Sequence, residues 1–595
     1  MGELPSNQVR PAESPAALHT VAAGAVVAEE AFSDQNVFGV PLVGVLLPLL
    51  FLRRRRGRDG SGRSQDDSQD GKNRKRHPSR QSSHAHLTQL ENGPIAADFM
   101  ARLPGSQKTA GASITEVSLA PGGGKLVQTA WHSLAWSRFG ISPLSKSGKG
   151  TIMTEQVISV EEEYRRRTPN SAEAFRRGRP VTAGPAKGAY FFQPYPLVMS
   201  RARGCILEDI DGHRYVDFAN HHSTQILGHN HPKVMEAIRA QLDQGTALGA
   251  PTGIETDMAA EMCERVATLD RVRFVNSGTE ATLHAVRLAR GFSRKSRIAK
   301  FEGGYHGSHD AVEVSVFPPL DRAGPVEAPH SVPGAGGMSP HAAGEVLVLP
   351  YNNEDAVARL IEEHAGELAC VMFDPKAGML PVRPEFARAV REITRRHGLL
   401  LIFDEIVGFR AGRGGLQEQF GIDPDLTCFG KIVGGGFPVG AFGGRADLMD
   451  LLDPSRGPTG FSQSGSFSAN PMTMAAGLAT LRELTPAAFD HLNGLADRLT
   501  AGLNDLFARR SVHAQAINTG SVFSIYFVEG KLETYRDLAR ADRALSHRVF
   551  LALLEGGYFL SHTLSMCALS LPMEERHITG LIAAMDKALD RVQDG

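Results

Sequence analysis

The sequence predicts an α/β protein, with a mostly parallel central sheet wrapped by helices and a smaller α+β domain. Short apolar segments alternate with amphipathic helices between residues 273 and 429, which is typical of a parallel sheet covered on both faces. Polar motifs follow several of these segments, where sheets of this kind bind ligands. After about residue 472 the pattern changes to longer helices with a few strands, which indicates the smaller domain.

The elements can be assigned in order along the chain. Residues 161–177 form a charged, helix-compatible segment, and 205–217 predict a β-hairpin with Asp211-Gly212 at its turn. A later strand is expected within 522–527. The strands expected in the main sheet are 273–275, 297–301, 346–349, 370–373, 399–403 and 426–429. The helices expected between them are 279–292, 354–363 and 384–397.

Composition divides the chain into four regions. Residues 1–152 are predicted to be a low-complexity, disordered extension, because their 57–95 stretch has almost no large apolar side chains to offset the entropy of ordering. Residues 153–229 are expected to contribute the N-terminal segment of the small domain. The large domain is expected to occupy 230–471, and the C-terminal part of the small domain 472–595.

One apolar run in the extension, residues 37–52, is followed by four arginines. It is short for a membrane span, which needs about 20 apolar residues, and Pro41 and Pro48 interrupt it. We therefore expect no membrane contact, with tethering by 37–52 as the alternative. A further alternative is that translation begins at Met153, so that the upstream residues would not be part of the natural protein.

Charge and cysteine usage exclude several classes of function. The formal net charge is -1, so no basic field favours nucleic acid. The five cysteines have no paired spacing, which argues against disulfides and CxxC zinc sites and favours the cytoplasm. His229 and His231 are the nearest pair of metal-ligand type, but a turn before a helix is the simpler interpretation. No metal site is predicted.

Ser277, Gly278 and Thr279 follow the 273–275 strand and open a helix. Free backbone N–H groups and the helix dipole attract an anion at such a point, and glycine lets a phosphate approach the backbone. The alternative is an ordinary helix cap, with Glu280 in the first turn.

Asp404 ends the apolar strand 399–403. A carboxylate at a buried strand end needs a cationic or hydrogen-bonding partner, and a protonated pyridine nitrogen would be one. The alternative is a structural ion pair with a nearby arginine, such as Arg410.

Lys431 lies between an apolar segment and three glycines, in residues 429–436 (FGKIVGGG). A lone lysine is usually a solvated surface residue, but these neighbours indicate an amine close to a ligand. Tyr305 and His306 occupy a glycine-rich loop after the 297–301 strand, where an aromatic ring could cover a planar cofactor; the alternative is simple loop packing. A phosphate nest, a carboxylate and an amine are together what pyridoxal 5'-phosphate (PLP) requires.

These residues resemble the class III aminotransferases, which are fold-type I PLP enzymes. The resemblance is greatest to the branch of glutamate-1-semialdehyde aminomutase and β-amino-acid aminotransferases. It extends from about residue 185 to the C-terminus. It rests on the segments 274–282, 301–307, 402–405, 429–436 and 468–471.

The resemblance implies a role for each matching residue. Lys431 would form the Schiff base and carry the proton, while Asp404 would pair with the pyridine nitrogen. The cofactor-binding set would be Ser277, Gly278, Thr279, Tyr305, His306, Asp404 and Lys431, with residues 230–471 as the PLP-binding domain. Members of the family are homodimers with shared active sites, in which a hydroxyl of one subunit reaches the partner's phosphate. Ser466 occupies that position here.

This chain departs from the family pattern where substrates bind. The family's carboxylate-binding arginine near the first strand is replaced by a segment in which Lys187 is the nearest cation, and lysine lacks the planar two-point grip of arginine. His222 stands where an aromatic residue is common, and Leu564 where some β-amino-acid enzymes carry a second arginine. Asp374-Pro375, followed by Lys376, replaces the usual Glu-Pro. These departures make Lys187, His222 and Leu564 the predicted substrate residues.

The resemblance implies an aminotransferase that moves an amino group between an amino acid or amine, β-amino acids included, and a keto acid. Its partners would be a small-molecule amino donor and a keto-acid acceptor. An aminomutase, epimerase or decarboxylase on the same fold is the first alternative. A catalytically silent scaffold is the second, and the presence of both Lys431 and Asp404 argues against it.

Overall fold

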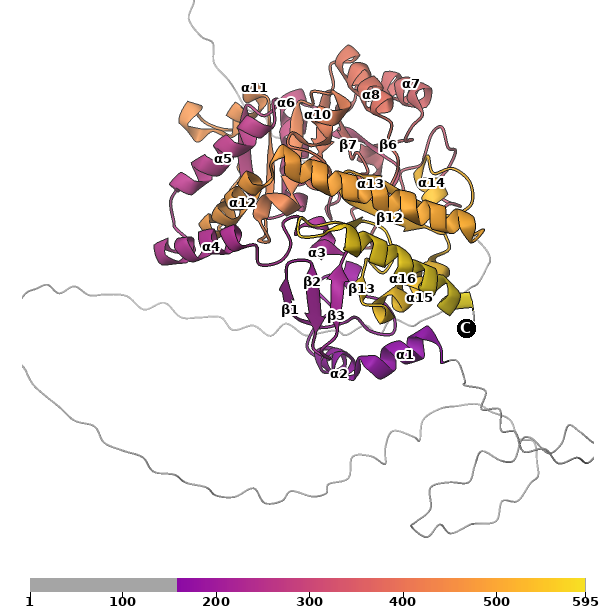
Figure 1. Cartoon of the computed structure of the whole chain (residues 1–595). Helices are drawn as coiled ribbons and strands as arrows, with labels where there is room; N and C mark the ends of the chain where they lie inside the picture. Colours follow the sequence, from indigo (N-terminus) through magenta and orange to yellow (C-terminus); the bar gives the residue numbers. More distant parts are fainter. Residues whose placement is uncertain (1–157, 594–595) are drawn as a thin grey trace, which may run out of the picture. The chain divides into compact units, whose positions relative to one another are not determined.

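The structure is a computed structural model that describes residues 158–593 (Figure 1). The expectations for residues 1–152, including the apolar run 37–52 and a start at Met153, lie outside the described residues. Within 158–593, no helix is both long and apolar enough to cross a membrane.

A seven-stranded sheet forms the centre of the large α/β part and confirms the predicted fold class. All strands predicted for it are present. The strand order is β4 (Arg271–Val275), β10 (Gly440–Gly444), β9 (Leu426–Gly430), β8 (Leu400–Asp404), β7 (Leu368–Phe373), β5 (Arg297–Phe301) and β6 (Val346–Leu349). The strands from β9 to β6 in this order pair in parallel, and β10 runs antiparallel to both of its neighbours.

The strand β10 was not among the strands predicted from the sequence. Its sequence, GAFGG, has little β-propensity, but its glycines are required by close neighbours. A Cβ at Gly440 would lie 1.9 Å from the carbonyl oxygen of Ser277, and one at Gly443 would lie 2.2 Å from that of Arg271. β10 is therefore a strand that only glycine allows to fit between β4 and β9.

Helices cover both faces of this sheet, which explains its uninterrupted apolar strands. Alternate residues face opposite layers: Val371 and Phe403 pack with α7 (Glu354–His364) and α8 (Pro384–Arg396), whereas Met372 and Ile402 pack with α6 (Gly278–Ser293). Figure 1 shows α7 and α8 side by side at one edge of the described chain.

Two smaller sheets complete the described part. The first sheet contains β1 (Met199–Arg203), β2 (Ile206–Asp209), β3 (Arg214–Asp217) and β13 (Tyr558–Phe559). The predicted hairpin is present as β2 and β3, and β13 pairs parallel with β3, so that segments near both ends of the described chain share this sheet. The second contains β11 (Gln515–Thr519), β12 (Val522–Tyr526) and β14 (Cys567–Ala568).

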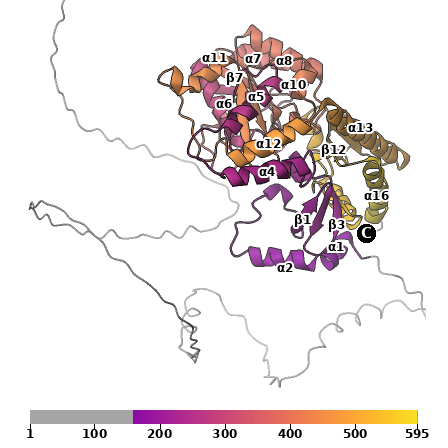
Figure 2. The same cartoon turned by 60° about the vertical axis from the view of Figure 1, so that its left-hand side comes forward.

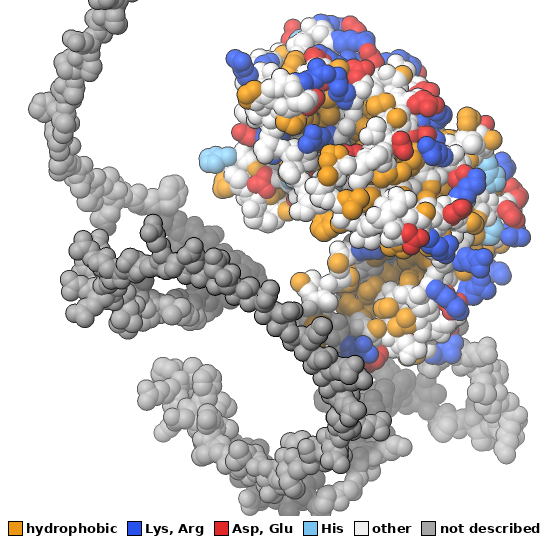
Figure 3. Space-filling view, turned by 90° about the vertical axis from the view of Figure 1, so that its left-hand side faces the viewer, with side chains coloured by type: hydrophobic (Ala, Val, Ile, Leu, Met, Phe, Trp, Pro, Cys, Tyr) orange, Lys and Arg blue, Asp and Glu red, His pale blue; other side chains and the backbone are white. Residues whose placement is uncertain are grey.

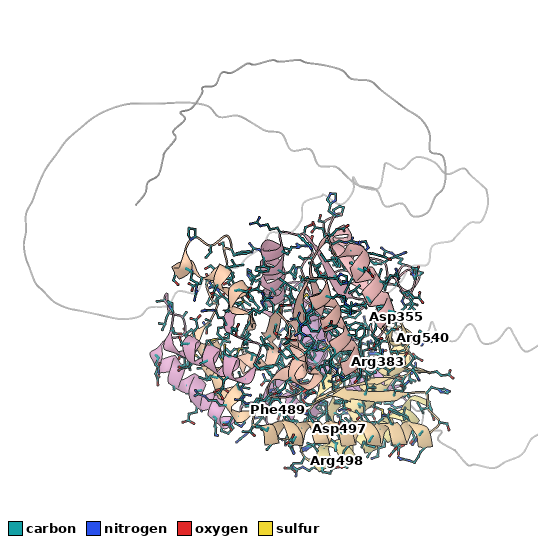
Figure 4. The ribbon with its side chains drawn as sticks, turned by 90° about the horizontal axis from the view of Figure 1, so that it is seen from above. Asp355, Arg383, Phe489, Asp497, Arg498 and Arg540 are labelled. Atoms are coloured by element: carbon teal, nitrogen blue, oxygen red, sulfur yellow. The ribbon has the colours of Figure 1, made fainter. Side chains whose placement is uncertain are left out.

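The helices α12 (Pro471–Glu483) and α13 (Pro486–Arg509) follow each other in the chain but pack against different elements. Helix α12 lies on α4 (Pro232–Gln244) and α5 (Gly253–Arg265), as Figure 2 shows, whereas α13 packs on α16 (Glu575–Gln593) and β11. Arg498, labelled on α13 in Figure 4, donates to Glu575 of α16 at 3.0 Å. Because α12 packs with helices before residue 471, the predicted boundary between 471 and 472 stays a prediction.

The charged segment 161–177 is two helices rather than one. Helix α1 ends at Arg167, and α2 begins at Pro169, which lacks an N–H and is tolerated in a first turn. The remaining helices are α1 (Val160–Arg167), α2 (Pro169–Gly178), α3 (Asn220–Ser223), α9 (Glu405–Gly408), α10 (Gly415–Phe420), α11 (Ala446–Met449), α14 (Tyr535–Leu538) and α15 (Arg543–Glu555). The short 3-10 helices are η1 (Gly188–Tyr190), η2 (Ala343–Glu345), η3 (Lys431–Gly434), η4 (Asp450–Leu452) and η5 (Pro454–Arg456).

Candidate active site

Strand register brings the three predicted cofactor motifs to one edge of the central sheet. Asp404, the last residue of β8, lies opposite Cys428 of β9, and β9 ends two residues later, directly before Lys431. Gly440 lies opposite both Gly430 and Val275, the last residue of β4. The carboxylate, the amine and the start of α6 are therefore neighbours in the fold, as the sequence predicted.

The N-terminus of α6 combines a helix cap with free N–H groups. Ser277 is the N-cap, and its Oγ accepts from the N–H of Glu280 at 3.1 Å, so the predicted helix cap is present. Within residues 158–593, the N–H groups of Gly278 and Thr279 donate no hydrogen bond. Two unpaired donors at the positive end of a helix dipole suit a phosphate.

The loop that carries Tyr305 packs closely on this N-terminus. Ser308 donates its N–H to Thr279 Oγ1 at 3.4 Å. Gly307 has φ +100, and a Cβ there would lie 2.6 Å from Thr279 Oγ1, so a larger residue would separate the loop from the helix. The Tyr305 side chain is 52% exposed, and stacking on a cofactor stays a prediction for it.

Asp404 pairs with His306 rather than with an arginine. His306 Nδ1 lies 2.8 Å from Asp404 Oδ2, and the N–H of Ile406 donates to Asp404 Oδ1 at 3.1 Å. Burial raises the pKa of Asp404 to about 7, and burial lowers the pKa of His306 to about 3. His306 is thus neutral and fixes the carboxylate, which would be stabilised in its charged form by a protonated ring nitrogen.

The alternative prediction, an ion pair between Asp404 and Arg410, was wrong. The Arg410 guanidinium donates to Ser521 Oγ at 3.0 Å, to Asn220 Oδ1 at 3.3 Å, and to the carbonyls of Ser223 and Leu569. None of these acceptors is a carboxylate. Hydrogen bonds from a charged donor contribute about 1.5–3 kcal/mol each, and burial lowers the pKa of Arg410 to about 9.

Lys431 is held in an uncommon conformation at the start of η3. Its φ is +51, in the left-handed region that is costly for residues other than glycine and is found where function requires it. Its Nζ makes no hydrogen bond or ion pair within residues 158–593. Burial lowers its pKa, against the opposing charge of Asp404, which favours the neutral, nucleophilic amine.

Ile406 is a site residue that sequence reasoning missed. A Cβ added at Gly278 would lie 2.7 Å from Ile406 Cδ1, and one added at Gly430 would lie 3.4 Å from Ile406 Cγ2. Ile406 therefore lies between the α6 N-terminus and the residue before Lys431. Its position two residues after Asp404 was the available signal.

The predicted substrate residues differ in their surroundings. Lys187 Nζ contacts His221 Nε2, and the His222 ring lies 4.4 Å from the ring of Tyr190. Burial lowers the pKa of His222 to about 4, and the charge of Lys431 adds to the effect. The turn α3, which carries His222, contacts η3, whose first residue is Lys431. Leu564 is fully buried in the apolar core, and its role in substrate binding stays a prediction.

His221 and His222 belong to a left-handed turn that no sequence signal predicted. The four residues of α3 have φ values of 50, 48, 54 and 64, and each left-handed residue other than glycine costs about 1–2 kcal/mol. Asp217 accepts from the N–H of Asn220 at 2.8 Å, and Thr224 Oγ1 lies 2.9 Å from His221 Nδ1. Strain of this kind is characteristic of functional sites.

His229, one of the two histidines considered as metal ligands, pairs with a carboxylate. His229 Nε2 lies 2.8 Å from Asp217 Oδ2, so it supports the carboxylate that holds the left-handed turn. Within residues 158–593, no group of three or more His, Cys, Asp or Glu side chains is arranged to hold a metal.

Comparison with known proteins identifies the family. The class-III aminotransferase family matches residues 190–588. The chain belongs to this family. Among curated relatives, the glutamate-1-semialdehyde 2,1-aminomutase of Methanothermobacter thermautotrophicus is 37% identical over 430 residues, which are 71% of this chain and 100% of that protein.

Solved structures of two transaminases share the fold. An omega-transaminase from Sphaerobacter thermophilus is 40% identical, with a TM-score of 0.68 over 71% of this chain and 98% of that one. A β-phenylalanine aminotransferase from Variovorax paradoxus is 34% identical, with a TM-score of 0.66 over 72% and 96%. The fold is that of fold-type I PLP enzymes, and the cofactor of the family is PLP. The α6 N-terminus, Asp404 and Lys431 fit it.

Proposed function

We propose that this class-III aminotransferase transfers an amino group from an amino acid or amine, β-amino acids included, to a keto acid. The observation that carries the proposal is the meeting of Lys431, Asp404 and the α6 N-terminus at one edge of the central sheet. PLP, when bound, supplies an aldehyde for the amino group and an electron sink.

Each residue of the site has a separate role. Lys431 Nζ supplies the amine and carries protons at the reacting carbon. Asp404, fixed by His306, holds the proton on the ring nitrogen. Ser277, Gly278 and Thr279 hold the phosphate, while Tyr305 and Ile406 cover the ring, and Lys187 and His222 contact the substrate.

A second candidate function is an aminomutase, which moves the amino group within one molecule. The curated relatives are named glutamate-1-semialdehyde 2,1-aminomutase, and a glutamate-1-semialdehyde aminomutase of Pseudomonas aeruginosa shares the fold at 25% identity. The two candidates differ in whether a keto product leaves the site when no acceptor is present.

We propose that the chain acts as a homodimer with shared active sites. Ser466 is exposed in the loop before α12, and the adjacent Phe467 is 63% exposed. Leu242 and Leu248, at the end of α4 and just after it, are each 52% exposed. The face drawn in Figure 3 carries hydrophobic side chains among charged and polar ones, and exposed apolar side chains are what a second copy would cover.

We also propose that the protein works in the cytoplasm. The five cysteines are all free, and four of them are buried, as expected in a reducing compartment.

A product assay tests the proposed function. The PLP-loaded enzyme is mixed with a panel of amino donors, with β-phenylalanine and simple amines included, and no acceptor. We expect about one equivalent of keto product per active site, and none from Lys431→Ala. Lys531→Ala, at an exposed position, is the matched control and should behave as the wild type. Isomerisation of a donor without keto product would contradict amino transfer and favour the aminomutase.

A further inference from the structure

The left-handed turn α3 contacts η3, the segment that begins at Lys431, and carries two histidines. His221 and His222 are its central residues, and His221 in turn contacts Lys187. Asp217 and Thr224 bind the first residue of the turn and His221. Backbone bonds also run from the N–H of Ser223 to the carbonyl of Ala219 at 3.4 Å, and from the N–H of Thr224 to the carbonyl of Asn220 at 2.9 Å. None of these bonds involves the carbonyl of Ser223 at the end of the turn, where a left-handed run of residues other than glycine returns readily to ordinary backbone conformations without support.

Arg410 supplies that support from behind the turn. Its Nη1 donates both to Asn220 Oδ1, at 3.3 Å, and to the carbonyl of Ser223, at 2.8 Å, which are the first and last residues of α3. The side chain is 1% exposed, and no carboxylate within residues 158–593 pairs with it. A buried guanidinium without a counter-charge is costly, so its bonds to neutral groups indicate a positional role.

The same side chain joins the turn to the rest of the site. Arg410 follows Asp404 by six residues across the short helix α9, so its backbone belongs to the segment that carries the cofactor carboxylate. Its Nε donates to Ser521 before β12, and its Nη2 to Leu569 after β14. One planar, five-donor group thus contacts three separate segments, which lysine cannot reproduce.

We infer that Arg410 is a positioning residue that fixes the turn Asn220–Ser223 and so sets the place of His221, His222 and Lys187 in the substrate site. The consequence for substrate binding rests on the proposed function. The geometric part, that the turn depends on Arg410, does not.

Steady-state kinetics of Arg410→Lys test the consequence for substrate. We expect KM for the amino donor to rise at least about tenfold, kcat to change less than about threefold, and the dissociation constant of PLP from the enzyme to stay within about twofold. The control is Arg265→Lys, which also removes a buried guanidinium bonded to two carbonyls, those of Leu481 and Leu484, and should leave KM unchanged. An unchanged KM in Arg410→Lys would overturn the inference.

A background without the two substrate-contacting side chains shows whether Arg410 acts through them. In the Lys187→Ala, His222→Ala background, Arg410→Lys should raise KM less than about threefold, since its routes to the substrate are already lost. A full tenfold effect in that background would contradict the inference. If Arg410→Lys does not fold, Asn220→Ala removes the same hydrogen bond from the other side and is measured in its place.

A crystal structure of Arg410→Met decides the geometric part without any activity. We expect at least one of His221 and His222 to leave the left-handed region, while β8 and Lys431 stay in place. A turn that keeps all four positive φ values would refute the inference. If the wild type transfers no amino group, the proposed function fails, yet this structure still decides whether Arg410 holds the turn.

Discussion

Asp404 is a carboxylate that the fold itself buries. Within residues 158–593, its hydrogen-bond partners are His306 and the N–H of Ile406, and His306 is neutral. Burial therefore raises the pKa of Asp404 to about 7. A cationic ring nitrogen beside it would favour the charged carboxylate, so PLP, when bound, would offset the cost of burying Asp404.

This cost predicts a pH-dependent effect of Asp404→Asn on the cofactor-free protein. Between pH 4 and 7 the folded wild type keeps a proton that the unfolded chain releases, so its stability falls by roughly 3–4 kcal/mol as the pH rises. The stability of the Asp404→Asn variant does not fall in this way, because asparagine does not titrate. We expect it to melt at a higher temperature than the wild type at pH 8, and at a similar one near pH 4.

The same variant should bind PLP at least about tenfold more weakly, because asparagine cannot neutralise a ring cation. Melting curves across pH and a PLP titration measure both effects. Asp243→Asn, at an exposed position, is the control and should change neither. Equal melting temperatures of wild type and Asp404→Asn at pH 8 would show that Asp404 is not strained by burial.

The site residues that lie at strand ends could be predicted from the sequence. An apolar strand followed by Asp404, or by a glycine-flanked Lys431, is visible without coordinates. The sequence did not suffice for Arg410. Its distance from Asp404 along the chain made an ion pair plausible, but the chain turns through α9 between them and directs the guanidinium to Asn220 and Ser223.

At the scale of elements, β10 shows how backbone proximity builds the site. Its glycines let β4 and β9 approach closely enough for the α6 N-terminus and Lys431 to share one ligand. The contact at Gly440 is with backbone, the carbonyl of Ser277, which cannot move away without displacing the start of α6.

Gly440→Ala should therefore disturb both stability and cofactor binding. We expect a loss of about 1–3 kcal/mol or more in the free energy of unfolding, and weaker PLP binding, because the added Cβ displaces Ser277. Gly366→Ala, where a Cβ meets nothing within 4 Å, is the matched control and should change stability by less than about 0.5 kcal/mol. Chemical denaturation and PLP titration of both variants check this. Wild-type stability in Gly440→Ala would disprove the close approach.

Most elements of the main sheet were predictable, because strands such as 370–373 are uniformly apolar and the helices between them are periodic. Two elements that build the site were not. The strand β10 is defined by its neighbours rather than by its own residues. The turn α3 takes its conformation from Asp217 and from Arg410, which is 190 residues away from Asn220 in the sequence.

At the scale of the whole molecule, the exposed apolar side chains near Ser466 predict the assembly. We expect Phe467→Asp to shift the protein from dimer to monomer and to weaken PLP retention, since a buried charge at an interface is costly. Val181→Asp, at another exposed apolar position, should leave the dimer intact. Sedimentation equilibrium measures both. A dimeric Phe467→Asp variant would place the interface elsewhere.

The pairing of β3 with β13 also governs when the protein can become active during its synthesis. Val216 and Tyr558 are neighbours in the sheet but roughly 340 residues apart in the chain, which a ribosome needs roughly 20–70 seconds to translate. The adjoining left-handed turn also depends on Arg410, whose own partners include Ser521 and Leu569. The central sheet can fold on the emerging chain, but the substrate side of the site is completed only after the last strands have left the ribosome.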